Sequence, residues 1–352
     1  MSISLAKGGA ERSTALLTKM LHDLGHEVHL VILEDNISYD HSGELYNLGK
    51  GKKKNDNILR RVSRFRKLKK FIEAQNFDTI IDNRARNNGF REVYYLNYIY
   101  SGQRIIYVVH SGAVKNYLGG ESGILSNYTK RLMAKKVAQF VAVSNDIKKV
   151  LTKTYGISKV VKIYNPIEEI EENLLQIEED YILFVGRLVD EVKNLRLLLH
   201  AYAKSQLPEI NVKLFILGDG PDLELMKSMA VDLKISNQVK FLGFKKKVQY
   251  YYFNAKFTIL TSRYEGFPRV LIESLSVGTP VVSVDCISGP SEIISHEENG
   301  LLVENYNADK LTLAINRMYK DNNLYITCKK NAKSSAAHLK MKNIALQWEE
   351  II

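Results

Sequence analysis

The sequence predicts an α/β protein built from two doubly wound domains, each a parallel sheet with helices on both faces. Short apolar runs alternate with longer amphipathic stretches along almost the whole chain. This is the order expected when each strand is followed by a crossover helix. The length of 352 residues is sufficient for two domains of ordinary size.

The first half of the chain contains a series of predicted strands separated by helices. The strands are runs rich in Val, Ile and aromatic residues, at 26–33, 77–82, 104–110, 139–144 and 160–165. Apolar residues at helical spacing predict helices at 14–25 and 58–72. Before the first helix, only the short run SISL (2–5) can form a further strand.

The second half repeats the alternation and ends in a helix that returns to the first domain. Its predicted strands lie at 181–186, 212–218, 239–243, 257–261 and 280–284, and its helices at 194–204, 223–233 and 308–320. The boundary is expected near Asn165–Pro166, before the acidic stretch 168–180, which is typical of a linker. We therefore expect domains of residues 1–164 and 165–339, with a C-terminal helix at 340–352 packed on the first.

Composition indicates a globular protein of a reducing compartment. Apolar residues make up 45% of the chain, and the two cysteines, Cys286 and Cys328, are too few for a disulfide framework. The sequence has neither an apolar run long enough to cross a membrane nor the apolar core of a signal peptide, so we expect a cytoplasmic protein. The net charge of +11 arises from +14 in residues 1–164 and −3 in the remainder. Such asymmetry indicates an anionic partner, a membrane or a nucleic acid.

The segment 262–278, SRYEGFPRVLIESLSVG, predicts a loop and a helix directly after a buried strand. Gly266 allows a tight turn, and Pro268 suits the first helical turn because its missing N–H has no partner there. Gly278 is expected to end the helix. The loop therefore lies at the carboxyl end of a strand, where doubly wound sheets bind ligands.

Two carboxylates of this segment, Glu265 in the loop and Glu273 in the helix, are candidate functional groups. A pair of carboxylates is also the catalytic set of glycosidases. Eight residues of helix would separate these two by ~12 Å, more than the roughly 5 Å of retaining glycosidases. A loop that shortens the distance would leave that alternative open, as would a purely structural role for both side chains.

Other polar residues follow predicted strands. Arg187 and Lys193 stand after the strand at 181–186, where two cations can hold a diphosphate or form a surface pair. The glycine pair Gly8–Gly9 precedes a helix expected to begin near Glu11, so its backbone N–H groups can bind phosphate or form a simple turn. His110 ends a strand and is either a hydrogen-bonding group of the site or structural. No metal-binding motif and no P-loop is found.

Seven short motifs, taken together, resemble glycosyltransferase family 4, the retaining group with the GT-B fold. In chain order they are GGAER (8–12), AVSND (142–146), YNPI (164–167), VGRL (185–188) followed by Lys193-Asn194, GDGP (218–221), EGFPRVLIE (265–273) and GPSEII…NGLLVE (289–304). The resemblance runs through nearly the whole chain. It implies two Rossmann-like domains facing across a cleft, with a nucleotide sugar held mainly by the second.

The resemblance also implies roles for single residues. Glu273 would accept hydrogen bonds from the ribose hydroxyls, and Glu265 would face the hydroxyls of the donor sugar. Arg187 and Lys193 would neutralise the diphosphate leaving group, and His110 would reach the donor sugar from the first domain. The remaining donor-binding residues implied are Gly8, Gly9, Gly243, Gly266, Phe267 and Pro268.

The implied activity is that of a metal-independent retaining hexosyltransferase without a cofactor. The donor would be a nucleotide sugar, UDP-linked, carrying a hexose or N-acetylhexosamine, and the acceptor a glycan or lipid-linked glycan of surface polysaccharide, lipopolysaccharide or capsule synthesis. Two departures from the family pattern stand out. One extra residue, at Val192 or beside it, separates Arg187 from Lys193, and the first strand is short. A truncated chain or a misplaced start codon would explain the short strand.

The stretch 50–74 and the arginines after the strand at 77–82 are expected on the acceptor side. Lys and Arg fill most positions between the apolar residues of the helix, which favours an anionic membrane surface; the alternative is a core-facing helix with a solvated basic face. TKRLMAKK (129–136) adds a second basic patch, and we expect a peripheral protein at the inner face of the cell membrane. Arg84, Arg86 and Arg91 would line the acceptor side and contact a phosphate or an acidic sugar.

Two other functions remain as alternatives. Sugar-nucleotide epimerases share the GT-B fold and would consume the donor without an acceptor. A nucleic-acid-binding protein would account for the net charge, but no RRM, KH or helix-turn-helix pattern is present. We therefore expect no nucleic-acid partner.

Overall fold

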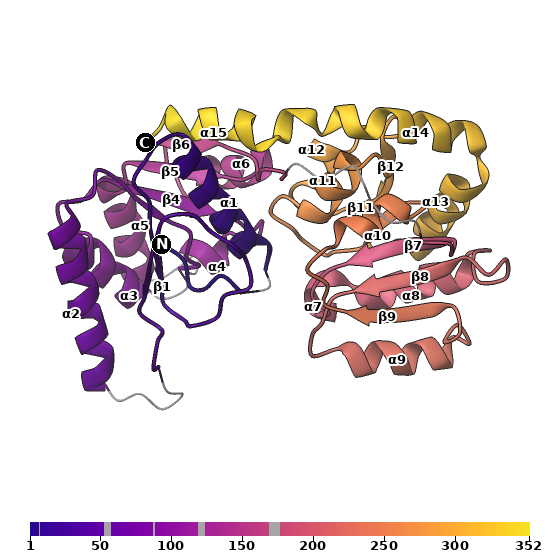
Figure 1. The fold of residues 1–352 in the computed structure, drawn as a ribbon, viewed down its shortest axis with the longest axis horizontal. Coiled ribbons are helices and arrows are strands. Elements are labelled where there is room, and N and C mark those ends of the chain that lie inside the picture. The colour runs from indigo at the N-terminus through magenta and orange to yellow at the C-terminus, as the bar shows by residue number, and fades with distance from the viewer. Residues whose placement is uncertain (7, 53–57, 87–88, 119–123, 169–176) are drawn as a thin grey trace. The chain divides into compact units, whose positions relative to one another are not determined.

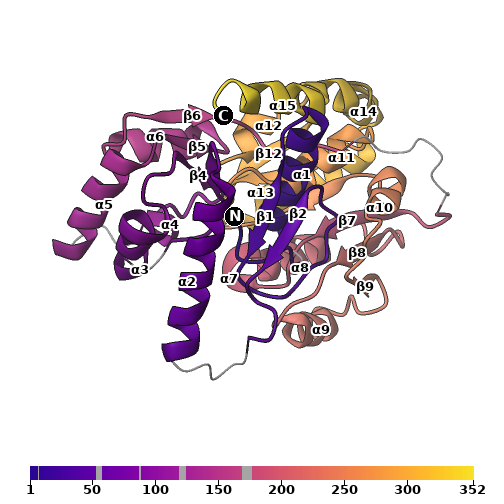
Figure 2. The same cartoon turned by 60° about the vertical axis from the view of Figure 1, so that its left-hand side comes forward.

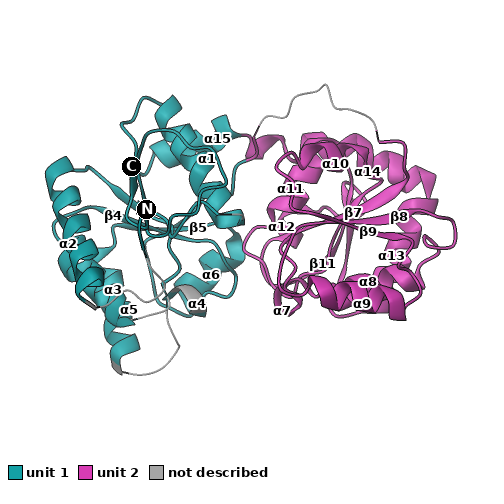
Figure 3. Cartoon of the chain, turned by 60° about the horizontal axis from the view of Figure 1, so that its bottom comes forward, with its two compact units in different colours: residues 1–166, 341–352 teal, residues 167–340 magenta. Residues whose placement is uncertain are grey.

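The computed structural model describes residues 1–6, 8–52, 58–86, 89–118, 124–168 and 177–352. The chain divides into two compact units (Figures 1 and 3). Unit 1 comprises residues 1–166 and 341–352, and unit 2 comprises residues 167–340. The boundary after residue 166 lies two residues beyond the expected one, and the boundary after residue 340 lies one residue beyond the expected one. Most of the expected linker at 168–180 lies outside the described residues.

Unit 1 is an α/β unit whose described strands all pair in parallel. Four of them form a sheet in the order β3-β4-β5-β6, and β1 and β2 form a separate pair (Figure 2). The strands are β1 (His29–Ile32), β2 (Glu44–Asn47), β3 (Ile80–Asp82), β4 (Ile105–Val109), β5 (Gln139–Ala142) and β6 (Val160–Lys162). The helices are α1 (Gly9–Asp23), α2 (Ile58–Gln75), α3 (Gly89–Tyr94), the π-helix η1 (Tyr95–Ile99), α4 (Lys115–Leu118), α5 (Ile124–Lys136), α6 (Asn145–Lys153) and α15 (Met341–Glu349).

Residues 1–5 lie between β1 and β3, where the short predicted first strand was expected. On one side, Ser2 pairs with Ile32 in a parallel bridge. On the other side, the backbone N–H of Asn83 donates to the carbonyl oxygen of Met1, at 2.9 Å. These bonds are isolated rather than a continuous ladder, so the segment links the β1–β2 pair to the four-stranded sheet without merging them.

The C-terminal helix α15 packs in unit 1, although the chain reaches it from unit 2. It contacts α1, and Ile344 and Trp348 on it are buried. The guanidinium of Arg104 donates to the carbonyl oxygens of Ile351 and Ile352 at 2.7 and 2.8 Å. This side of unit 1 is therefore closed by the last residues of the chain.

Unit 2 contains one six-stranded parallel sheet in the order β12-β11-β10-β7-β8-β9. Its strands are β7 (Tyr181–Val185), β8 (Lys213–Leu217), β9 (Val239–Gly243), β10 (Thr258–Leu260), β11 (Val281–Asp285) and β12 (Gly300–Glu304). Its helices are α7 (Asp190–Lys193), α8 (Leu195–Lys204), α9 (Leu223–Asp232), α10 (Gln249–Asn254), α11 (Arg269–Ser276), α12 (Pro290–Ile293), α13 (Ala308–Lys320), α14 (Asn322–Ser335) and the 3-10 helix η2 (Ala337–Leu339).

The order of the unit 2 strands creates a topological switch point beside β7. From β7 the chain builds outward in one direction through β8 and β9, and in the other through β10, β11 and β12. Helices leaving β7 and β10 therefore lie on opposite faces, and the carboxyl ends of two such strands are where doubly wound sheets bind ligands. Both strands are almost wholly buried, so their ends are held firmly.

The predicted α/β class with two parallel, doubly wound halves is confirmed. Every predicted strand is present except the short run at 2–5, which forms only isolated bridges. Two strands were missed. β2 has two exposed and two partly buried residues and therefore lacks an apolar run, and β12 was noted only as a motif. Helix α1 begins at Gly9, two residues before the expected start. Of the helices in the described part of the chain, none has the length and apolar content of a membrane span.

Candidate functional site

The switch point of unit 2 brings together two of the predicted site residues. Lys193 ends α7, which follows β7, and Glu265 follows β10. The Lys193 Nζ lies 2.6 Å from Glu265 Oε1, and the two side chains are 17% and 14% exposed. An ion pair this short and this sheltered holds both side chains in one orientation.

Neighbouring groups fix this ion pair in place. The Ser262 hydroxyl donates to the same oxygen of Glu265 at 2.6 Å. The Thr261 hydroxyl donates to the carbonyl oxygen of Lys193 at 2.8 Å, and the N–H of Arg263 donates to that of Val192 at 2.8 Å. Val192, beside which the family resemblance implies an extra residue, lies in the short helix α7, which docks on the loop after β10.

Arg187 stands at the same strand end but is exposed. Among the described residues, none forms an ion pair or a side-chain hydrogen bond with its guanidinium. No set of three His, Cys, Asp or Glu side chains in the described ranges is grouped to hold a metal ion. The positive charge at the carboxyl end of β7 comes from Arg187 and Lys193.

The loop 265–268 is shaped by the segment before α12. The N–H of Glu265 donates to the carbonyl oxygen of Ile287 at 3.1 Å, and the Ser288 hydroxyl donates to that of Gly266 at 2.8 Å. Gly289 has a φ of +106°, and a Cβ there would lie 2.4 Å from Pro268 Cδ. The tight backbone approach therefore needs Gly289. Gly266, expected to make the turn, is not among the glycines with positive φ.

Helix α11 carries Glu273 and begins one residue later than expected, since Pro268 is the N-cap and Arg269 the first helical residue. Phe267 and Pro268 of the loop are buried. Gly278 has a φ of +88° just beyond the helix, as expected of a residue that terminates it.

Glu273 is 7% exposed and is held by two side chains that sequence analysis missed. Arg269 Nε donates to Glu273 Oε1 at 3.1 Å, and the Tyr252 hydroxyl donates to Oε2 at 3.3 Å. The i, i+4 spacing of Arg269 and Glu273 was visible in the motif and could have indicated the first contact. Tyr252 comes from α10, and nothing local in the sequence pointed to it.

Gly243 is the last residue of β9, the edge strand of the unit 2 sheet, and therefore lies at the carboxyl ends of the strands. It is exposed and has a φ of +67°, a conformation that favours glycine. Its carbonyl oxygen accepts the N–H of Gly218 at 2.9 Å. Gly218 itself has no room for a side chain, since a Cβ would lie 1.8 Å from the carbonyl oxygen of Gly186. The GDGP turn is therefore a backbone packing feature beside β7.

In unit 1, Gly8 and Gly9 begin α1 as the N-cap and first helical residue. The carboxylate of Glu11 folds back over them, because a Cβ on Gly8 would lie 2.1 Å from Glu11 Oε2. A carboxylate is favourable at this positive end of a helix. A phosphate bound by the same N–H groups would have to displace it.

His110 follows β4 in unit 1 and is partly buried. Its Nε2 lies 2.8 Å from Oδ1 of Asn83, which follows the neighbouring strand β3. The two residues therefore meet at the carboxyl edge of the unit 1 sheet. Asn83 was not predicted as a site residue.

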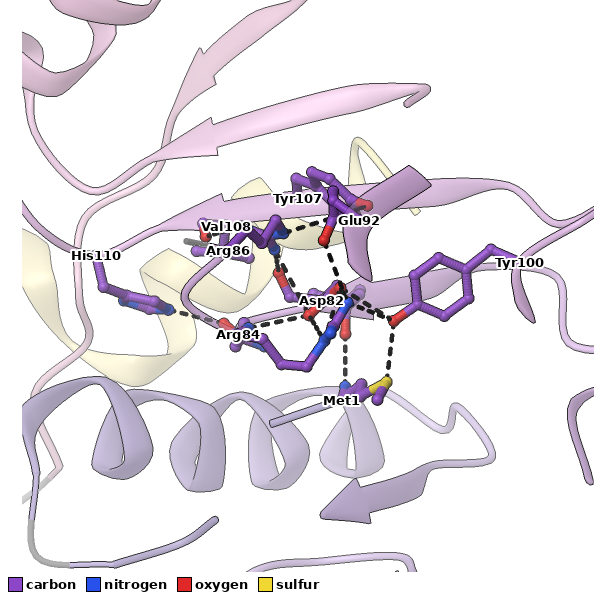
Figure 4. A network of polar contacts seen from close by, with 11 residues as sticks. Met1, Asp82, Arg84, Arg86, Glu92, Tyr100, Tyr107, Val108 and His110 are labelled. Atoms are coloured by element: carbon purple, nitrogen blue, oxygen red, sulfur yellow. Dashed lines mark hydrogen bonds and ion pairs between the residues drawn. The ribbon is translucent and has the colours of Figure 1, made fainter. Parts of the chain in front are cut away.

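Arg84 and Arg86 lie inside unit 1, which corrects the expectation that they line the acceptor side and contact an acceptor group. Their side chains are 3% and 0% exposed, and both pair with Asp82, with N–O distances of 2.6 and 3.5 Å (Figure 4). Glu92 of α3 adds weaker pairs at 3.8 and 3.9 Å. Buried guanidinium groups are stable only when they are paired. Asp82 and Glu92 are close to both arginines in the chain, but the sequence did not show that all four side chains would be buried together.

Aromatic rings complete this buried network. The guanidinium of Arg84 lies over the ring of Tyr95 at 3.6 Å, and that of Arg86 over the ring of Tyr107 at 3.8 Å, which adds cation–π attraction. Burial by itself would raise the pKa of Asp82, but Arg84 and Arg86 hold that pKa well below its ordinary value. The network is a charged core of unit 1.

Arg91 is exposed on α3, in contrast to Arg84 and Arg86.

The apolar stripe predicted for α2 does not pack as one surface. Leu68 and Ile72 are buried, whereas Leu59 is 78% and Val62 37% exposed. The Lys-rich loop before α2 was also expected to meet a membrane, and residues 53–57 of it lie outside the described residues.

Two family profiles match the two halves of the chain. Residues 7–169 match Glycosyltransferase Family 4, and residues 166–335 match Glycosyl transferases group 1. A relative from Campylobacter jejuni, N-acetylgalactosamine-N,N'-diacetylbacillosaminyl-diphospho-undecaprenol 4-alpha-N-acetylgalactosaminyltransferase, is 30% identical over 349 residues, which cover 95% of this chain and 93% of that protein. A lipopolysaccharide 1,6-galactosyltransferase from Escherichia coli is 32% identical over 173 residues, 47% of each chain.

Solved structures share the architecture. The crystal structure of Anabaena HepE in complex with UDP superposes with a TM-score of 0.75 at 19% identity, covering 99% of this chain and 97% of that chain. At this identity the likeness concerns the fold. The two-domain GT-B fold expected from the motifs is thereby confirmed.

Proposed function

The chain belongs to glycosyltransferase family 4, and we propose that it moves a hexose or N-acetylhexosamine from a UDP-sugar to a glycan or lipid-linked glycan. The observation that carries this proposal is the Lys193–Glu265 pair at the switch point of the unit 2 sheet. Doubly wound sheets bind nucleotides at this position. The name of the Campylobacter jejuni relative, with its N-acetylgalactosaminyl group and undecaprenol-linked acceptor, supports both substrate classes.

The two glutamates have different roles in this proposal. Glu273 accepts hydrogen bonds from the ribose hydroxyls. Its fixed orientation between Arg269 and Tyr252 supports this role. Glu265 faces the transferred sugar, and its pair with Lys193 holds it at the carboxyl ends of β7 and β10. The remaining donor contacts come from backbone groups of the loop 265–268, from Gly243 and from Gly8–Gly9.

Fixed positive charge drives the departure of the nucleoside diphosphate. Arg187 contributes a fork of donors and Lys193 a compact charge, and both face the negative charge that develops on the leaving phosphate. Lys193 is already oriented before the donor arrives, so little reorganisation is needed. These cations support a mechanism without a metal ion.

We propose that configuration at the anomeric carbon is retained. The acceptor hydroxyl attacks on the face from which the phosphate departs, and a phosphate oxygen of the donor takes its proton. His110 acts on the transferred sugar in this scheme. The product of a retaining reaction has the anomeric configuration of the donor, which proton NMR of the product distinguishes directly.

Nucleotide binding in the presence of EDTA tests the proposal. UDP should raise the melting temperature, and a panel of nucleotide sugars should show slow hydrolysis of one UDP-sugar. The Glu273→Gln variant should lose most of the UDP-dependent shift, with Glu224→Gln on α9 as an exposed control. A protein that no nucleotide stabilises would contradict the donor assignment, and a strict requirement for a divalent ion would contradict metal independence.

We also propose that unit 1 meets an anionic membrane through α2 and the neighbouring helices. Leu59 and Val62 are exposed on α2, and Phe90 of α3 is 76% exposed. The ring of Tyr94 contacts Phe65 of α2 at 5.6 Å, which places α3 and α2 side by side. Exposed apolar and aromatic side chains among basic residues are typical of a helix lying in a membrane interface.

Membrane binding through this surface would bring the enzyme to a lipid-linked acceptor. An acceptor anchored in the membrane can be reached only by an enzyme held at the lipid surface, and α5 adds the basic patch at 129–136. The exposed Arg91 on α3 takes the role first assigned to the three arginines, contact with an acidic acceptor group. The protein then works as a peripheral enzyme at the inner face of the cell membrane.

A further inference from the structure

The contact between Asn83 and His110 arises from the topology of unit 1. Strands β3 and β4 are parallel neighbours with Asp82 opposite Tyr107. The residues that follow them therefore emerge at the same edge of the sheet, where Oδ1 of Asn83 meets Nε2 of His110 at 2.8 Å. Asn83 is 7% exposed, so this bond is sheltered from water.

The chemistry of the two groups determines where the imidazole proton resides. A carboxamide oxygen only accepts hydrogen bonds, so the Nε2 that faces it must be the donor. In the neutral ring the single proton is then on Nε2, and Nδ1 is the acceptor atom. The hydrogen bond that Nε2–H of His110 donates to Asn83 Oδ1 thus favours one of the two tautomers and restricts the rotation of the ring.

Asn83 cannot easily turn away, because the residues on both sides of it belong to the buried charged network. Asp82 precedes it and Arg84 follows it, and these two are joined by an ion pair of 2.6 Å. The backbone N–H of Arg84 also donates to Asp82 Oδ1 at 2.9 Å. The turn that carries Asn83 is therefore closed by hydrogen bonds and an ion pair within it.

We propose that Asn83 is a positioning residue for the transfer reaction, holding His110 in the Nε2-protonated tautomer at a fixed orientation. This inference rests on the proposed function, in which His110 acts on the transferred sugar. The charged network of Asp82, Arg84 and Arg86 contributes to this positioning. It holds the turn that carries Asn83, and the side-chain amide of Asn83 in turn holds the imidazole of His110. Misplacement of a catalytic group by about 1 Å can cost on the order of 100-fold in rate.

The tautomer is measured without substrate. In a protein labelled with ¹⁵N, the ring nitrogens of His110 are assigned by comparison with His110→Gln, and their shifts identify the protonated nitrogen. We expect Nε2–H in the unaltered protein and a mixture of tautomers in Asn83→Ala. An Nδ1–H form in the unaltered protein, or an unchanged tautomer in Asn83→Ala, would overturn the proposal whatever the enzyme transfers.

Kinetics provide the second arm. Asn83→Ala should lower kcat about 10- to 100-fold with donor KM changed by less than about twofold, because the residue acts through His110. Asn83→Asp keeps the size and adds a negative charge, which raises the pKa of His110 and should shift the pH–rate profile to higher pH. The control is Asn97→Ala, an exposed asparagine of η1.

The two arms separate failure of this inference from failure of the proposed function. If Asn83→Ala and Asn97→Ala have the same kcat, or if Asn83→Asp leaves the pH profile unmoved, the positioning role is wrong. If the unaltered protein transfers no sugar at all, the proposed function fails and the tautomer measurement still decides whether Asn83 sets the state of His110.

Discussion

Lys193 and Glu265 form an ion pair of 2.6 Å across the switch point of the unit 2 sheet, although 72 residues separate them in the chain. One comes from the helix after β7 and the other from the loop after β10. Each is oriented by the other, and Ser262 holds the shared carboxylate oxygen. A donor diphosphate therefore meets an ammonium group whose position is already set.

Replacing Lys193 tests this arrangement. Lys193→Ala should lower kcat by about 10²- to 10³-fold, the usual effect of removing one group that stabilises developing charge. UDP affinity should fall much less, because the nucleoside keeps its contacts at Glu273. Steady-state kinetics and calorimetry with UDP measure the two effects, and Lys204→Ala on α8 serves as an exposed control. A loss confined to donor affinity would show that Lys193 only binds.

Substitutions of the two glutamates should have different effects on UDP affinity and kcat in the same assays. Glu273→Gln should chiefly weaken UDP binding, because the carboxylate held by Arg269 would no longer be charged. Glu265→Gln should chiefly lower kcat, since it faces the sugar and orients Lys193. Titration with UDP compared with turnover at saturating donor distinguishes them. Equal loss of UDP affinity in both variants would contradict the division of roles.

The arginines of unit 1 should differ according to burial. Arg84→Ala removes the closer of the two guanidinium partners of the buried Asp82 carboxylate, so the free energy of unfolding should fall by about 3–5 kcal/mol. Arg91→Ala, on the exposed face of α3, should change it by less than about 0.5 kcal/mol and raise acceptor KM. Urea unfolding and acceptor kinetics measure these quantities. A stable Arg84→Ala variant would mean that the charged network is dispensable.

Acid should destabilise unit 1 through Asp82. The pKa of this carboxyl is depressed in the folded protein, and its unfolded value is about 3.9. Its contribution to stability is therefore complete above about pH 4 and is lost as pH falls toward the folded pKa. Unfolding free energies measured between neutral pH and strong acid should decline more steeply for the unaltered protein than for Asp82→Asn. Parallel curves would exclude Asp82 as the source.

Membrane binding should depend on the exposed basic face of α2. Arg66, Lys67 and Lys70 are exposed on this helix, and each basic residue near an anionic surface contributes about 1 kcal/mol. Changing all three to Gln should weaken binding to phosphatidylglycerol vesicles about 100-fold. The control changes Lys320, Lys329 and Lys330 of unit 2 to Gln, which alters the net charge equally. Equal loss in both proteins would indicate a nonspecific charge effect.

Much of the fold was predictable because it depends on local patterns. Runs of apolar residues marked the strands, and the glycine after α11 marked the end of that helix. One miss has a local cause, because β2 lacks an apolar run. The other is tertiary, because the turn at 265–268 takes its shape from Gly289, which lies in another loop.

The site was predictable only in part, because side-chain direction is a tertiary property. Glu265 and Lys193 were expected at strand ends, but their pairing depends on β7 and β10 being neighbours in the sheet. Arg84 and Arg86 follow a strand in the same way, yet they turn inward. The sequence could not show that Asp82, Glu92 and several tyrosines would form a buried environment for them.

The sequence alone determined the family, the order of strands and helices, and which polar residues stand at the strand ends, since these follow from periodicity, turn chemistry and motif order. Only the tertiary structure decided which of those residues meet. Partners such as Asn83 and His110, or Lys193 and Glu265, are brought together by strand pairing between distant segments. Charge and burial then decided which arginines remain on the surface and which become part of the core.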